Sequence, residues 1–149
     1  MKILYVKNEK YNSNKIMVHS DNSFGTNTKE FFDFQVSLTT NRSLILNFDT
    51  YTKKCVSCEG YLFFNKKTKY KTIDFYKYAD GNLKIELSDF EKNNLLCDYE
   101  IKEQVVYDAE KTRICIGDMN NNEVIKFGCG QYALFQDDRL TGIVLDLNV

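Results

Sequence analysis

This chain of 149 residues contains no proline and no tryptophan, and its single histidine is His19. Without proline, the turns have to be formed by Gly, Asn, Asp, Ser or Thr. With one histidine, a Ser-His-Asp or Cys-His catalytic site would have to be built on His19. That residue stands beside Ser20 and Asp21, and no nucleophile-elbow pattern occurs anywhere in the sequence. We therefore expect a solvated histidine and a protein that is not an enzyme.

The sequence also lacks a long apolar run and a strong net charge. Its first apolar stretch, residues 3–6, is too short for a secretory signal, and no stretch approaches the length of a membrane span. We therefore expect a cytoplasmic protein that does not enter a membrane. The net charge of −1 disfavours a general nucleic-acid binder.

The charges are unevenly distributed along the chain. Residues 1–75 carry 12 Lys and Arg against 7 Asp and Glu, whereas residues 76–149 carry 8 against 14. If the two halves interleave in the fold, these charges mix over the surface. If they do not, the protein has an acidic face that is available to a basic partner.

Five cysteines are present, but they do not have the spacing of a zinc site. Cys55 and Cys58 form one Cys-x-x-Cys pair, and neither a second pair nor a Cys/His pair accompanies it. In a strand over residues 55–64 their side chains would point to opposite faces. A redox pair would instead stand at the start of a helix. We predict no metal, no cofactor, and reduced thiols that pack as small apolar side chains.

Aromatic residues are abundant, with 11 Phe and 10 Tyr, and they favour β-strands. One motif occurs twice, in residues 48–56 and 107–115: an aromatic residue and Asp, a short polar turn, then a basic residue and an apolar run. Each copy predicts a strand, a tight turn and a second strand. We expect equivalent antiparallel hairpins over residues 44–64 and 103–118.

Turn residues divide the remaining chain into further short strands, about ten to twelve in all. The expected strands outside the two hairpins cover residues 2–6, 15–19, 32–38, 70–78, 82–87, 123–127, 131–136 and 140–147. The expected loops and turns cover residues 21–27, 79–81, 120–122 and 137–139, and the Gly-x-Gly at 128–130 indicates a bulge or tight corner.

Ser88 and Glu91 match a capping box and predict one short helix over about residues 89–96. The pattern as a whole predicts a single mainly β domain, an antiparallel, hairpin-rich sandwich, roll or barrel with at most one short helix. A basic stretch at residues 66–71 could form a nucleic-acid patch, but its short length favours a solvated loop.

In the style of their hairpins, residues 44–62 and 106–149 resemble immunity proteins of bacterial polymorphic and contact-dependent toxin systems. Those immunity proteins are a loose assembly of small cytosolic inhibitors, many of them rich in Lys and Asn. The resemblance implies a non-catalytic protein that binds a cognate toxin domain and blocks its active site. It transfers no functional residue, because such families share none. Many of the toxins are basic nucleases, which an acidic surface would attract.

Binding residues are often found on turns that a rigid β scaffold holds in place. The candidate partner-binding residues are the acidic turn residues of the second half: Asp108, Glu110, Asp118, Glu123, Asp137 and Asp138. The alternatives are a phage- or bacteria-encoded inhibitor, a carbohydrate- or ligand-binding β module, and a small enzyme. A contiguous acidic face would favour the immunity protein. A tyrosine-lined groove would favour a carbohydrate-binding module, and a deep pocket with convergent polar groups would favour an enzyme.

Overall fold

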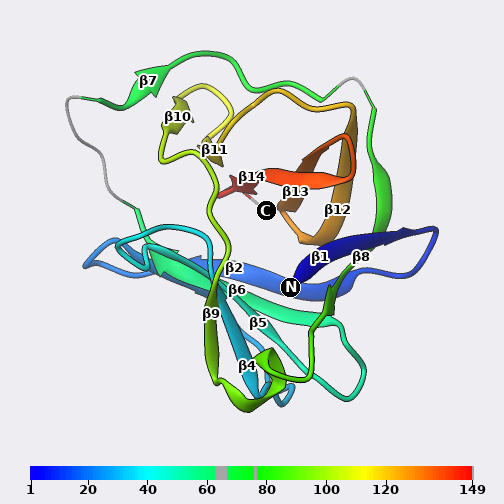
Figure 1. The fold of residues 1–149 in the computed structure, drawn as a ribbon. Helices are drawn as coiled ribbons and strands as arrows, with labels where there is room; N and C mark the ends of the chain where they lie inside the picture. Colours follow the sequence, from blue (N-terminus) through cyan, green and yellow to red (C-terminus); the bar gives the residue numbers. More distant parts are fainter. Residues whose placement is uncertain (63–66, 76, 149) are drawn as a thin grey trace.

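The computed structural model describes residues 1–62, 67–75 and 77–148 and shows a mainly β fold, as predicted (Figure 1). The strands are β1 (Lys2–Lys7), β2 (Asn12–Val18), β3 (Ser23–Thr26), β4 (Phe34–Ser37), β5 (Leu44–Phe48), β6 (Cys55–Tyr61), β7 (Lys69–Tyr70), β8 (Ala79–Glu86), β9 (Leu96–Asp98), β10 (Val105–Asp108), β11 (Arg113–Gly117), β12 (Glu123–Cys129), β13 (Gln131–Gln136) and β14 (Arg139–Asp146). In this part of the chain, no helix is long and apolar enough to cross a membrane.

Twelve of these strands form one curled sheet in the order β7-β10-β11-β14-β13-β12-β2-β3-β6-β5-β4-β9, and the β1–β8 pair joins it where β8 meets β12. The curl brings two parts of the sheet face to face (Figure 1). We call β10, β11, β14, β13 and β12 the C-terminal half-sheet, and β2, β3, β6, β5, β4 and β9 the N-terminal half-sheet. Most neighbouring strands are antiparallel, but β2 and β8 both run parallel to β12.

The main core draws buried side chains from both half-sheets. Phe34 and Phe48 enter it from the N-terminal half-sheet, and Phe135 and Ile143 from the C-terminal half-sheet. The alternation of apolar residues along these strands places one set of side chains on the inner face. Burial of this set supplies most of the driving force for closing the sheet on itself.

A second, smaller core lies on the opposite face of the C-terminal half-sheet. Residues 71–75, which we call the strap, contribute the buried Ile73 and the half-buried Phe75 to it. Val106, Cys115 and Val144 form part of the sheet surface under them. The strap therefore covers a β surface that would otherwise expose apolar side chains to water.

The two predicted motif hairpins are confirmed within the described residues. β5 pairs antiparallel with β6, and β10 pairs antiparallel with β11. Lys53 and Thr112 occupy the same position of the motif, and both are left-handed, with φ of 64° and 56°. Residues 63 and 64 of the first expected hairpin lie outside the described residues.

The last hairpin also agrees with the prediction. β13 and β14 pair antiparallel and are joined by Asp137 and Asp138, which have φ of 51° and 63°. Two consecutive residues with positive φ form the type I′ turn that matches the twist of a β-hairpin. The predicted corner at residues 128–130 is present as well, with a register shift beside Gly128 and a φ of 71° at Gly130.

The predicted hairpin around residues 79–81 is wrong. Gly81 lies inside the continuous strand β8, opposite Lys7 of β1, and the described residues among 71–78 are not in a strand. A Cβ atom at position 81 would lie 2.1 Å from the backbone oxygen of Val6. Close approach of two strands, and not a tight turn, therefore explains this glycine.

Two further expectations need correction. Residues 23–26, expected in a loop, form β3, which bridges β2 and β6. The expected helix over 89–96 is reduced to a single 3₁₀ turn, Glu91–Asn93, although Ser88 and Glu91 do form the reciprocal capping bonds of 3.0 and 3.2 Å. None of the turn's residues is buried. A longer helix there would gain little from packing.

Candidate functional site

The structure separates the six predicted acidic residues into two groups at opposite ends of the C-terminal half-sheet. In the β11–β14 pairing, Arg113 lies opposite Asp146 at one end and Gly117 lies opposite Gly142 at the other. The β10–β11 turn is at the first end and carries Asp108 and Glu110. At the second end are the remaining four, which we call the acidic end: Asp118 in the loop between β11 and β12, Glu123 at the start of β12, and Asp137 and Asp138 in the β13–β14 turn.

Backbone and side-chain hydrogen bonds hold the two segments of the acidic end together. The backbone N–H of Asn122 donates to the oxygen of Phe135 at 2.9 Å. Its side-chain amide donates to Oδ1 of Asp137 at 3.2 Å, and the N–H of Asp137 donates back to Oδ1 of Asn122 at 3.3 Å. Between the segments lies a shallow hollow of about 460 Å³, lined by Asp118, Asn120, Asn121, Gln136 and Thr141.

Most of the negative charge at the acidic end remains uncompensated. Glu123 forms an ion pair of 2.8 Å with Lys7, but within the described residues no ion pair involves Asp118, Asp137 or Asp138. Asp137 and Asp138 are both exposed. The pKa of Tyr5, whose hydroxyl is 3.4 Å from Oδ1 of Asp138, is raised by burial first and then by the charges of Glu123 and Asp138. The surface therefore presents a negative field to a partner.

Asp108 does not belong to this surface. The sequence placed it on an exposed turn, whereas the structure buries it at 5% exposure. Its Oδ2 accepts the N–H of Ile73 at 2.9 Å and its Oδ1 accepts the N–H of Lys111 at 3.2 Å. These hydrogen bonds, with that of Ile73 the strongest cause, lower the pKa of Asp108. Asp108 therefore secures the strap, while Glu110 is exposed but lies at the end away from the other carboxylates.

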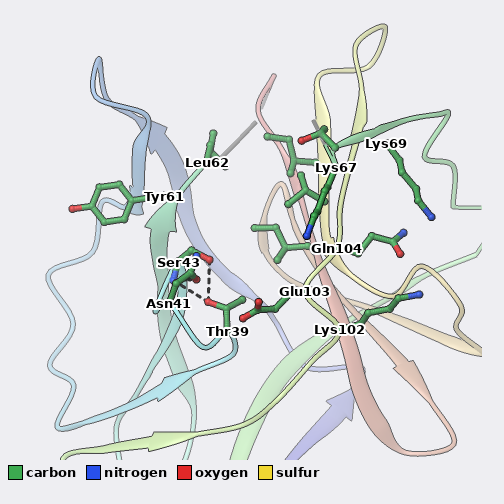
Figure 2. A pocket seen from close by; sticks show the side chains of 14 residues that line it. Thr39, Asn41, Ser43, Tyr61, Leu62, Lys67, Lys69, Lys102, Glu103 and Gln104 are labelled. Carbon is green, nitrogen blue, oxygen red and sulfur yellow. Dashed lines mark hydrogen bonds between the residues drawn. The ribbon is translucent and has the colours of Figure 1, made fainter. Parts of the chain in front are cut away.

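A pocket that sequence reasoning missed lies between the two half-sheets, and Figure 2 shows its lining. Its volume is about 400 Å³. Thr39, Asn41 and Ser43 form one wall, and Lys67 and Gln104 are on the facing wall. The lining comes from five separate segments, residues 39–43, 61–62, 67–69, 102–105 and 114–116. Of these segments, the sequence marked only the basic stretch at 66–71. The pocket itself was missed because no spacing along the chain links the five segments.

The Cys-x-x-Cys pair is arranged differently from the expectation. A register shift between Asn47 and Phe48 lets Cys55 oppose Phe48 and Cys58 oppose Leu46. Phe48 and Leu46 share one strand face, so the bulge turns both thiols toward the same core, and the expected opposite faces are wrong. Among the described residues, no group of three or more His, Cys, Asp and Glu side chains is placed to hold a metal ion.

The burial of the thiols leads to a reactivity prediction. Burial raises the pKa of Cys55 and of Cys115 to about 12, and it raises that of Cys58 strongly. Cys97 and Cys129 are half-buried, and burial raises the pKa of Cys97 as well. A thiol-disulfide reagent at pH 8 should therefore modify the half-buried Cys97 and Cys129 in the folded protein and the three core cysteines only after unfolding, because the reagent must reach the sulfur and the thiolate is the reactive form.

Counting released chromophore with Ellman's reagent, before and after addition of guanidinium chloride, checks this order. Cys97→Ser/Cys129→Ser should remove the reaction seen before guanidinium chloride is added and leave the later reaction unchanged. Rapid modification of either member of the Cys55 and Cys58 pair in the folded protein would contradict the burial argument.

No protein-family model matches this sequence, and no curated protein matches it significantly. We therefore infer the function from the geometry of the acidic end.

Proposed function

We propose that this protein is a non-catalytic inhibitor of the immunity type, which binds a basic toxin domain through the acidic end and covers the toxin's active site. The observation that carries the proposal is the convergence of Asp118, Glu123, Asp137 and Asp138 on two segments joined by hydrogen bonds. A fixed cluster of carboxylates speeds encounter with a basic surface and orients the partner.

The structure of the turn supports a role as a rigid contact surface. A two-residue type I′ turn ends the β13–β14 hairpin, and its strands are among the most buried of the sheet. Its carboxylates therefore lose little conformational freedom when a partner binds, which limits the entropic cost of association. Such preorganisation is what an inhibitor needs for tight binding.

The decisive variant is Asp118→Asn/Asp137→Asn/Asp138→Asn, which removes three negative charges and conserves local structure. Asparagine tolerates the positive φ of residues 137 and 138, whereas lysine would strain the turn. In the wild type, the N–H of Asn120 donates to Oδ1 of Asp118 at 2.9 Å, and the amide oxygen of an asparagine at position 118 can still accept this hydrogen bond. We expect the Kd for the toxin domain to rise at least about tenfold, because close charge pairs contribute about 1.5–7 kcal/mol of coupling and rim pairs much less.

The experiment requires the cognate toxin, which we expect to be encoded directly upstream of this protein. Co-expression of its toxic C-terminal domain with the wild type should protect cells, and the triple variant should protect poorly. The control is Asp21→Asn/Glu30→Gln/Glu110→Gln, which makes the same charge change on exposed residues away from the acidic end. Equal protection by the triple variant and the wild type would contradict the proposed surface. An upstream domain that is not toxic would contradict the immunity function.

A further inference from the structure

The N-terminal half-sheet ends at β9, and the outer edge of this strand is open. Within the described residues β9 pairs only with β4, to which it runs parallel, and it is the last strand of the curled sheet on this side (Figure 1). The oxygen of Leu95 accepts the N–H of Gln35 at 3.0 Å, and the N–H of Tyr99 donates to the oxygen of Ser37 at 2.8 Å. The residues of β9 that bond to β4 are therefore the odd-numbered ones.

The even-numbered residues of β9, Leu96 and Asp98, direct their backbone groups to the open side, because bonding residues alternate along a strand. Among the described residues, no hydrogen bond occupies the N–H or the C=O group of either residue. The edge thus offers two donors and two acceptors in the spacing of a β-strand.

The open edge is accessible from solvent and flanked by apolar side chains. Asp98 is exposed and Leu96 is half-buried, while Leu95 and Phe90 are 79% and 81% exposed. The chain has no proline and β9 has no lysine, although these residues commonly protect a sheet edge from pairing with another chain. β9 is only three residues long, which limits an added strand to a few residues.

The charge of the open edge is negative. Asp98 and Glu100 are exposed, and neither takes part in an ion pair among the described residues. Two cations precede β9, and both are already paired: the N-terminal ammonium with Glu91, and Lys92 with Asp89. A second copy of the chain would bring a like charge to this edge, whereas a basic segment would be attracted to it.

The open edge adjoins the acidic end. The hydroxyl of Tyr99 donates to the oxygen of Leu140 at 3.4 Å, and the guanidinium of Arg139 donates to the oxygen of Glu100 at 3.4 Å. Leu140 follows Asp138 by two residues. The chain that leaves β9 therefore lies against the β13–β14 hairpin, so that one partner can contact both the acidic end and the edge of β9.

We propose that an extended segment of the partner, with at least one Lys or Arg, adds to β9 as a further strand. Its backbone bonds to the free groups of Leu96 and Asp98, and its basic residue faces the carboxylate of Asp98. Apolar side chains of the segment cover Leu95 and Phe90. In strand addition the main-chain hydrogen bonds supply affinity and the side chains supply specificity. For the identity of the partner as a toxin domain, this inference rests on the proposed function.

Hydrogen exchange, measured by NMR with and without the domain encoded directly upstream, tests the strand addition. The amides of Leu96 and Asp98 should exchange rapidly in the free protein and at least about tenfold more slowly in the complex, because each gains an acceptor. The amide of Cys97 already bonds to β4 and should change less. The amide of Val18 should stay fast, since this exposed residue also points its N–H away from its neighbour β3.

Leu96→Pro tests the same contact by affinity. Proline at this position removes only the outward N–H and no bond to β4, and sheets tolerate proline where the N–H faces solvent. We expect the Kd to rise about tenfold through faster dissociation, with an unchanged far-UV spectrum. Val18→Pro is the matched control and should leave the Kd unchanged. Asp98→Asn should slow association about threefold at low salt, since it removes a charge that attracts the partner.

The outcomes separate this inference from the proposed function. If the upstream domain binds but the amides of Leu96 and Asp98 stay unprotected, or if Leu96→Pro binds as tightly as the wild type, strand addition is wrong and the proposed function stands. Protection of both amides by a domain that is not toxic would overturn the immunity function and support strand addition. An upstream domain that does not bind would contradict both.

Discussion

Gly60→Ala should destabilise this protein by about 3 kcal/mol or more, enough to unfold a large fraction of a marginally stable chain. Gly60 lies in β6, between Phe24 of β3 and Leu44 of β5. A Cβ atom at position 60 would lie 2.0 Å from the backbone oxygen of Ser43 and 3.0 Å from the ring of Phe24. The first contact joins a Cβ atom, which is fixed to its own backbone, to a backbone oxygen. The clash can therefore be relieved only by separating two paired strands.

Gly25→Ala is the matched control, because Gly25 lies in the neighbouring strand β3 and faces the same strand β6. A Cβ atom there would meet only Cβ of Glu59, at 3.8 Å, an ordinary van der Waals distance. Its effect should stay within about 0.5 kcal/mol, or be slightly stabilising through the unfolded chain. Urea denaturation followed by far-UV circular dichroism measures both variants. Equal stability of the two would show that β5 and β6 do not approach as closely as described.

Asp108→Asn should lower the melting temperature by several degrees, far more than the same change at the equivalent motif residue, Asp49. Both carboxylate oxygens of Asp108 accept backbone N–H groups, and one of these belongs to Ile73 of the strap. An amide has one acceptor oxygen, so the substitution leaves one buried N–H facing an NH₂ group. Among the described residues, the side chain of Asp49 accepts only the N–H of Tyr51 within its own turn, a bond that asparagine can keep.

The effect of Asp108→Asn should depend on pH in a defined direction. Hydrogen bonds lower the pKa of Asp108 in the folded state, so the unfolded chain takes up its proton first as pH falls. The carboxylate therefore stabilises the fold above about pH 4, and this contribution is lost as pH falls through the lower, folded-state value. Thermal melts at pH 7 and pH 3 should show the difference between variant and wild type shrinking at acid pH.

Hydrogen exchange provides a local test of the same role. The amide of Ile73 should exchange faster in Asp108→Asn, because its acceptor is weakened, while amides in β5 and β6 keep their protection. If Asp49→Asn and Asp108→Asn had equal effects on stability, the bond from Asp108 to the strap would not be contributing.

Local sequence signals predicted much of the fold. The aromatic-Asp motif predicted both hairpins, and Asp137 and Asp138 marked the type I′ turn between β13 and β14. These predictions succeeded because hairpins pair residues that are near in sequence, so turn chemistry and alternation are enough to specify them. The capping box of Ser88 and Glu91 also formed, although no residue of the turn is buried, so little packing energy is available to extend it.

Local signals failed wherever a distant strand decided the conformation. The Asp-Gly pair at residues 80 and 81 is typical of a turn, but pairing with β1 makes it part of a strand. The Cys-x-x-Cys spacing predicts opposite faces, but a bulge against β5 turns both thiols inward. Each case depends on a partner strand that no local pattern identifies.

The sequence by itself determined the mainly β class, the two motif hairpins, the last hairpin and the excess of acidic residues in the second half. Only the tertiary structure decided which acidic residues share a surface: it placed Asp118 beside the 137–138 turn and buried Asp108 under the strap. It alone assembled the pocket between the half-sheets from five separate segments. The physical reason is that turn and strand preferences act over a few residues, whereas surfaces and pockets depend on which strands pair and how the sheet curls.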